Sequence, residues 1–264
     1  MLYPVVLIAI LLVFSRNNWK WKLKAILSFI LVISFVVGIW SFRNYNKYGR
    51  FQVTTHSGWT LLFYYTSFTK QRITNENIDT IRTHFQQEAD SIGFRKSKNM
   101  FDQAAIYKEV ASNYITKHKG VYLLTNLQGC VNMFLAIGNK GMATTLGWNA
   151  SAPKESFAVI TPQRILQNFT SSTRETILGL IIVLFLAVQY IGALIGLFKL
   201  FIARKYMAVT LIILTVMYFA GVSGVLGTYR FKLPVVPLIC IAAGYGYANL
   251  KGKKQVKDTQ KEIQ

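Results

Sequence analysis

Apolar residues gather in blocks along this chain, and the blocks have the length of membrane-crossing helices. A helix needs about 20 largely apolar residues to cross a bilayer, with a working range of about 17–25. Four blocks meet this requirement, and a fifth, Met1–Phe14, is apolar but shorter. The pattern predicts an all-α polytopic membrane protein with about five transmembrane helices, the four longer ones being Leu23–Trp40, Ile177–Phe198, Met207–Leu226 and Pro234–Leu250.

A long segment, residues 41–176, separates the second span from the third, and apolar residues recur within it every three or four positions. That period is typical of amphipathic helices. We expect one such helix from Ile78 to Ile92 and another from Phe101 to Ile115. Ser41–Lys70, rich in Thr, Tyr and Gly, is predicted to be irregular or partly extended, and Asn139–Thr173 to be a loop with one short strand or turn.

Val121–Gly138 is apolar and nearly long enough to cross the bilayer itself. Three amide side chains, Asn126, Gln128 and Asn132, would be costly in lipid. Crossing would also move the basic stretches that follow it to the other side of the membrane. We therefore expect a helix that lies in the membrane interface or packs on the bundle.

Positive charge predicts the orientation of the spans. The chain has 30 Lys and Arg against 10 Asp and Glu, and 52% of its residues are hydrophobic. Short loops rich in Lys and Arg stay in the cytoplasm, and alternating spans place three such stretches on one side. The orientation of the spans therefore accounts for much of the excess positive charge, which argues against a nucleic-acid partner. The stretches are Arg16, Lys20, Lys22 and Lys24; Lys199, Arg204 and Lys205; and Lys251, Lys253, Lys254, Lys257 and Lys261.

Four parts follow from this topology, in a protein of the plasma (inner) membrane with its N-terminus outside and its C-terminus in the cytoplasm. Residues 1–40 form two transmembrane helices around a basic cytoplasmic loop. Residues 41–176 form a mostly helical extracytoplasmic segment, whose excess of cations either attracts anionic lipid head groups or forms a solvated basic surface. Residues 177–250 form three transmembrane helices, and residues 251–264 form a basic cytoplasmic tail.

The sequence offers few of the patterns that carry soluble enzyme chemistry. Its three histidines are isolated from one another, so no metal site is expected. Cys130 and Cys240 are not expected to pair. Gly192 and Gly196 form a GxxxG pattern, which in a span favours helix packing. The span interiors lack charged side chains, which counts against an ion-coupled carrier.

Aromatic and cationic residues cluster where the spans meet the outer surface. Trp40 and Tyr229 are expected to anchor the interface, and the neighbouring cations can extend toward head groups. A second interpretation is that Arg43, Arg230 and Lys232 converge on a lipid phosphate, because guanidinium and ammonium groups suit that ligand. Prolines at 234 and 237 would then stiffen the start of the last span.

Two sets of motifs here resemble those of a known family. Trp40-x-x-Arg43-Asn44, then Gly49-x-Phe51 and Ser57-Gly58, resemble the W-x-x-R-N…G-x-F…G signature of bacterial C-type integral-membrane glycosyltransferases of the protein-mannosyltransferase and aminoarabinose-transferase type. Arg230-Phe231-Lys232-Leu233-Pro234-x-x-Pro237, followed by Ala243-Gly244, is similar to their late R-[FY]-R-x-P-x-x-P…A-G motif. Two positions depart from the pattern: Ile39 stands where the family often has Pro, and Lys232 replaces a usual Arg.

The resemblance covers the C-terminal half of such an enzyme. It implies transfer of a sugar from a polyprenyl-phosphate carrier to a glycan, lipid or protein acceptor outside the cytoplasm. It also implies that Arg43, Arg230 and Lys232 serve the lipid phosphate. The acidic general base belongs to a first outer loop that this chain lacks, so its catalytic residue stays unassigned. No cofactor is implied for this chain, since a divalent metal ion, where such enzymes use one, belongs to the other half.

Two other functions stay open on the sequence. One is a non-catalytic membrane remnant or partner subunit that binds lipid phosphate, because no acidic residue here can be matched to the family's base. The other is a lipid or polysaccharide carrier, which the uncharged span interiors disfavour.

Overall fold

The fold is all-α, as predicted, in a computed structural model that describes residues 3–15, 18–138, 142, 145–147 and 173–250. No strand occurs in these ranges. The 41–176 segment and the basic tail are thus described only in part or not at all. The helices are α1 (Tyr3–Phe14), α2 (Trp19–Tyr48), α3 (His56–Thr60), η1 (Leu61–Thr66), α4 (Ser67–Thr74), α5 (Ile78–Ile92), η2 (Phe94–Lys96), α6 (Met100–Lys117), α7 (Lys119–Leu135), α10 (Thr173–Ile202), α11 (Tyr206–Ser223), η3 (Gly224–Leu226), η4 (Tyr229–Lys232) and α12 (Val236–Ala248).

Three helical stretches are long and apolar enough to cross a membrane: Trp19–Tyr48, Thr176–Ile202 and Tyr206–Leu226. Two further apolar helices, α1 and α12, are shorter, with 12 and 13 residues. The five apolar helices match the five predicted, but the last is shorter than expected, because α12 starts at Val236 and ends at Ala248, two residues inside each predicted bound. The protein is therefore a helical membrane protein.

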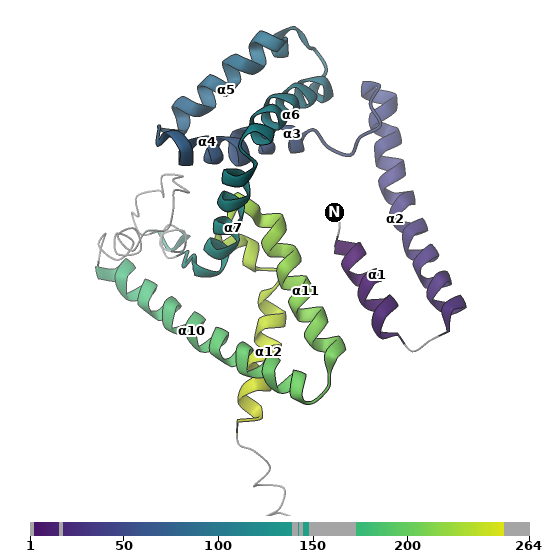
Figure 1. The fold of residues 1–264 in the computed structure, drawn as a ribbon, viewed down its shortest axis with the longest axis vertical. Coiled ribbons are helices and arrows are strands. Elements are labelled where there is room, and N and C mark those ends of the chain that lie inside the picture. Colours follow the sequence, from purple (N-terminus) through teal and green to yellow (C-terminus); the bar gives the residue numbers. More distant parts are fainter. Residues whose placement is uncertain (1–2, 16–17, 139–141, 143–144, 148–172, 251–264) are drawn as a thin grey trace, which may run out of the picture.

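The elements divide between two ends of the molecule. Figure 1 shows the α1–α2 turn, the α10–α11 turn and the C-terminal end of α12 at the lower end, and α3 to α6 gathered at the upper end. Lys20, Lys22 and Lys24 thus lie at the same end as Lys199, Arg204 and Lys205, whereas the third basic stretch lies outside the described residues. We call the upper group, α3 to α6 with η1 and η2, the head, and α10 to α12 the bundle.

Helix α2 does not stop where the first transmembrane pair was expected to end. Asn18 caps its start by accepting hydrogen bonds from the backbone N–H groups of Lys20 and Trp21. The helix then runs for 30 residues to Gly49, whose φ of 69° ends it in the left-handed region. The predicted boundary at residue 41 therefore lies inside a helix.

The stretch that was predicted to be irregular is also mostly helical. Residues 41–48 belong to α2, and residues 56–74 form one continuous helical run that includes the π-helical turn η1. Hydroxyls stabilise that turn: Thr66 donates to the Leu61 carbonyl at 2.9 Å, and Ser67 to the Leu62 carbonyl at 3.0 Å. Packing and these local bonds outweigh the weak helix propensity of Thr, Ser and Gly.

Large side chains form the core of the head, where the two predicted amphipathic helices are confirmed as α5 and α6. Phe85 is 2% exposed and Ile81 is fully buried, and both pack on the π-helical turn through Leu62. Of the apolar positions predicted to be buried on α5, Ile92 is exposed. The other buried members of this core are Phe63, Ala89, Tyr107, Val110 and Ala111.

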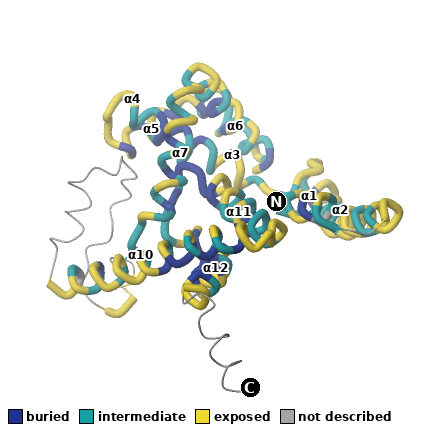
Figure 2. The backbone as a smooth tube through the Cα atoms, turned by 60° about the horizontal axis from the view of Figure 1, so that its bottom comes forward, coloured by how far each residue is buried: buried dark blue, intermediate teal, exposed yellow. Residues whose placement is uncertain are grey.

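Small residues form the closest contact in the bundle, where α10 crosses α12. A Cβ atom on Gly196 would lie 1.8 Å from the Ala242 carbonyl oxygen, and one on Gly246 would lie 2.3 Å from the Gly192 carbonyl oxygen. The crossing is dark blue in Figure 2, whereas the ends of α10 are largely exposed. The GxxxG pattern therefore packs two helices, as predicted.

Candidate functional site

The first set of motif residues holds the chain as it leaves α2. Trp40 donates its indole N–H to the Val53 carbonyl at 2.9 Å, and the Asn44 amide donates to the Gln52 carbonyl at 2.7 Å. The Arg43 guanidinium lies over the Trp40 ring, 4.9 Å from its centre. These contacts fix residues 49–55, which lead directly into α3.

Gly58 then brings α3 against α6. A Cβ atom at this position would lie 2.1 Å from the Ala104 carbonyl oxygen, so only glycine permits the approach. Buried Gly58 lies between His56 and Trp59, which both face outward from α3. The close contact therefore sets the position of these two aromatic rings.

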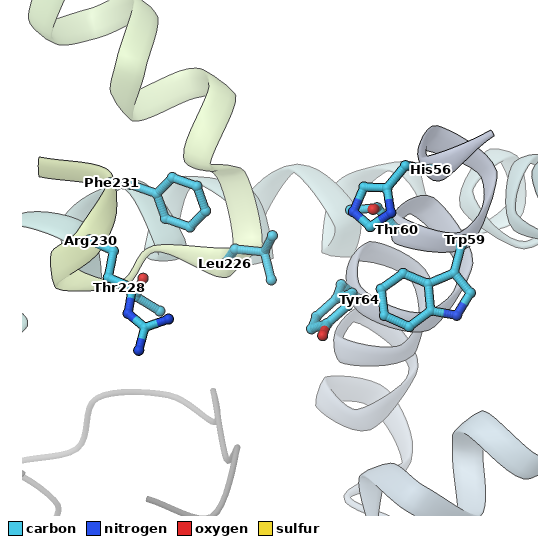
Figure 3. Close-up of a pocket in the computed structure, with 8 residues that line it drawn as sticks. All are labelled: His56, Trp59, Thr60, Tyr64, Leu226, Thr228, Arg230 and Phe231. Carbon is cyan, nitrogen blue, oxygen red and sulfur yellow. The ribbon is translucent and has the colours of Figure 1, made fainter. Parts of the chain in front are cut away.

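A cavity of about 450 Å³ lies between the head and the outer end of the bundle, shown in Figure 3. One wall comes from α3 and η1, and the other from the turns between α11 and α12. Arg230 and Tyr64 stand on opposite sides of the hollow. Its lining residues are His56, Trp59, Thr60, Tyr64, Leu226, Thr228, Arg230 and Phe231.

The lining combines one permanent cation with aromatic surface. Arg230 is exposed, and no described residue forms an ion pair or hydrogen bond with its guanidinium. Trp59 packs on Tyr64 with ring centres 5.2 Å apart, so the two rings form one apolar wall. None of the described residues that line the cavity carries a carboxylate. Such a lining suits a ligand with an anionic group beside an apolar or ring-shaped part.

Thr60 adds a polar atom to the aromatic wall. Its Oγ1 is buried and finds no hydrogen-bond partner within the part of the chain that the structure describes. Buried hydroxyls are nearly always hydrogen-bonded in proteins, so an atom of this kind calls for an explanation. A hydroxyl or phosphate oxygen of a bound ligand would provide the partner.

Lys232 lies two residues from Arg230 but does not line the cavity. It is buried, and its ammonium donates to the Ala136 carbonyl at 2.8 Å and to the Phe134 carbonyl at 3.3 Å. These carbonyls follow the last turn of α7, where a cation is favoured by the helix dipole. Burial lowers the pKa of Lys232 to about 8.

Of the five site residues predicted from the sequence, one lines the cavity and the others lie elsewhere. Arg230 lines the cavity, whereas Arg43 and Lys232 do not. Trp40 is half exposed beside Arg43, and Tyr229 packs its ring on Gly138, where an added Cβ would lie 2.8 Å away. The two predicted interface anchors therefore both make specific contacts with the protein.

Sequence reasoning missed the wall opposite Arg230. Its members, His56, Trp59, Thr60 and Tyr64, directly flank the Ser57-Gly58 motif, and that proximity was the signal that could have found them. As for a metal centre, no three His, Cys, Asp or Glu side chains cluster among the residues placed by the structure.

Comparison with known proteins returns no match of any kind. No family model matches the chain, and no curated protein or solved structure is significantly similar to it.

Proposed function

We propose that the protein is the C-terminal portion of a membrane glycosyltransferase, and that the cavity binds a polyprenyl-phosphate-linked sugar. One observation carries this proposal. Neighbours of the Ser57-Gly58 motif form one wall of the cavity, and Arg230 and Phe231 of the late motif, about 170 residues away, lie on the opposite wall. Both belong to the same family resemblance, and their meeting in space was not required by the sequence.

The cavity chemistry fits the donor side of such a reaction. In sugar transfer, the bond between the sugar's anomeric carbon and the phosphate oxygen breaks, and its electron pair stays on the departing phosphate. Arg230 can stabilise that charge through two parallel hydrogen bonds. The acceptor hydroxyl bonds to the anomeric carbon and loses its proton to a general base. No carboxylate is among the described residues that line the cavity, so the proposal assigns no general base.

The proposal includes the topology inferred from charge. The protein lies in the plasma (inner) membrane with its N-terminus outside and its C-terminus in the cytoplasm. The head and the cavity then face outward, where a carrier-linked sugar would meet a glycan, lipid or protein acceptor.

The lack of an acidic lining residue favours a second candidate function. In this alternative the chain is a non-catalytic remnant or partner subunit, which binds the lipid phosphate but transfers nothing. Both functions require Arg230 to contact phosphate.

A binding experiment on the whole chain in lipid nanodiscs tests both candidates. The probe is undecaprenyl phosphate, measured against wild type, Arg230→Ala, Arg230→Lys and the control Arg95→Ala, whose side chain is 81% exposed on the head. Loss of a hydrogen bond to a charged group costs about 1.5–3 kcal/mol, so Arg230→Ala should bind roughly 10- to 150-fold more weakly. Arg230→Lys should retain part of the affinity, and Arg95→Ala all of it.

Equal binding by wild type and Arg230→Ala would refute both candidates. If binding depends on Arg230, a transfer assay separates them, with the sugar-loaded carrier and isolated membranes as the acceptor source. Transfer that Arg230→Ala abolishes supports the enzyme, and binding without transfer supports the subunit.

A further inference from the structure

Helix α7 carries an apolar face that no described part of the protein covers. Five side chains on it are more than half exposed: Leu123, Leu124, Leu127, Val131 and Leu135. At about 100° per residue they occupy one arc, about 120° wide, along four turns. A stripe of that length facing water would be unusual, since large exposed apolar patches mark contact surfaces.

The opposite face of α7 is packed against the end of α11. A Cβ atom on Gly129 would lie 2.0 Å from the Gly224 carbonyl oxygen, so the two backbones touch. Thr125 and Met133, one turn to either side, are buried, and the Cys130 thiol lies 3.1 Å from the Ala220 carbonyl oxygen. The helix therefore has one face on the protein and one face without a partner.

Two of the three amide side chains that counted against α7 in the sequence are hydrogen-bonded within the protein. The Gln128 amide oxygen accepts a hydrogen bond from Arg72 of the head, and the Asn126 amide donates to the Tyr122 carbonyl at 2.8 Å. These bonds reduce the cost of placing amides next to lipid, which had counted against this helix in the sequence.

The contact between α7 and the start of α12 indicates how deep α7 reaches. With 13 residues, α12 is about 20 Å long, whereas the hydrocarbon core is about 30 Å thick. Lys232 of η4, four residues before Val236, is bound to the last turn of α7, so the end of α7 lies close to the start of α12. Phe134 also packs against the apolar cluster of the bundle, and Tyr190 of α10 donates to its carbonyl at 3.0 Å.

The backbone of the turns between α11 and α12 needs α7 to shelter it from lipid. Residues 224–235 contain two short 3-10 turns and no regular α-helix. Irregular backbone within the hydrocarbon region is tolerated only where protein shelters it. Helix α7 provides the shelter, through Gly129 against Gly224 and Gly227 and through its carbonyls on Lys232.

We propose that α7 is a half-membrane helix, embedded in the outer half of the bilayer, whose exposed leucine face contacts lipid acyl chains. Lys117 and Lys119 lie exposed at its outer end, at the height of the anionic head groups. Leu135, at the other end, is the deepest of the five exposed residues. Lipid is the occupant because the last turn of the same helix packs, through Phe134, on the apolar core of the bundle.

Spin-label accessibility tests this depth directly. Single cysteines replace Leu123, Leu127 and Val131 in a Cys130→Ala, Cys240→Ala background, and each carries a nitroxide in proteoliposomes. Leu184→Cys on α10, 68% exposed, serves as the lipid-facing control, and Gln87→Cys on α5 as the water-facing control. Only variants that keep the thermal midpoint of the background are compared.

The expected result is that oxygen collides with the three α7 labels more often than a water-soluble nickel complex does, as at position 184. The ratio of oxygen collisions to nickel collisions should rise from position 123 to position 131, because the helix descends into the bilayer. A ratio like that at position 87 would overturn the proposal in favour of a water-facing surface. Low accessibility to both reagents would overturn it in favour of cover by protein, such as a second copy of the chain.

A second measurement needs no substitution. Unaltered protein in vesicles containing a photoactivatable phosphatidylcholine should become labelled within residues 121–135, and absence of label there would overturn the proposal. The lipid contact of α7 does not depend on Arg230, so it can hold or fail separately from the proposed function.

Discussion

The head and the bundle are both helical, but one pair of helices in each region meets through a different kind of side chain. In the head, α5 and α6 meet through large residues such as Phe85 and Tyr107. In the bundle, α10 and α12 meet through glycine and alanine, with backbone atoms in direct contact at Gly196 and Gly246. Apolar side chains on α2 and α10 point outward instead.

The difference reflects the solvent around each region. Removing large apolar side chains from water stabilises the head, at about 25 cal/mol per Å². In lipid that gain vanishes, because acyl chains are as apolar as leucine, and close backbone approach becomes the main attraction. A large apolar side chain should therefore contribute strongly to stability in the core of the head and little on the lipid-facing surface of the bundle.

The largest expected effect is at the centre of the head. Phe85→Ala should destabilise it by about 3–5 kcal/mol, because the side chain is 2% exposed and its loss leaves a cavity. Hydrogen–deuterium exchange of the α5 and α6 amides measures the change. The matched control is Phe198→Ala, where the ring is 65% exposed on α10 and only lipid contact is lost. Equal effects at the two positions would contradict the idea that burial of large apolar side chains stabilises the head more than the bundle.

A smaller effect is expected from adding bulk to the bundle. Gly246→Val forces a side chain into the backbone of α10 and should cost about 1–3 kcal/mol or more. Gly244→Val on the same helix is the control, since nothing lies within 4 Å of its Cβ position. Thermal unfolding midpoints in detergent compare the two. If both variants melted alike, helix propensity and not close packing would explain the loss.

The smallest effect is expected between α2 and the head. The loop residue Arg50 pairs with Asp102 of α6 at 2.6 Å, but the two side chains are 56% and 38% exposed. Such surface pairs contribute about 0.2–1 kcal/mol and weaken in salt. A double-mutant cycle with Arg50→Ala and Asp102→Ala measures the coupling. Coupling well above that range would mean that this end of α2 is fixed to the head by charge.

Much of the fold could be predicted from the sequence, because its signals are local. Block length marked the apolar helices, and a period of three to four marked α5 and α6. The helical run at residues 56–74 was missed because its stability comes from distant contacts, chiefly Gly58 on Ala104. The short α12 was missed for a related reason: the preceding turn is held by α7, about 100 residues away.

The candidate site was predicted only on one side. Arg230 stood out because a cation between two apolar blocks is conspicuous. The partners of Lys232 are backbone carbonyls, which every residue possesses and no sequence pattern can mark. Trp59 and Tyr64 lie among many other aromatic residues, and only the fold shows that they face Arg230.

The direct junction between α6 and α7 links the head mechanically to the cavity. Only His118 separates the two helices, so there is no slack between them. Helix α7 has 17 residues, and the carbonyl directly after it accepts a hydrogen bond from Lys232, two positions from Arg230. A tilt of the head, such as contact with an acceptor could cause, should therefore be transmitted along α7 and displace the turn that carries Arg230. The Arg230 guanidinium, which we propose as the phosphate contact, would then respond to an event on the other side of the head.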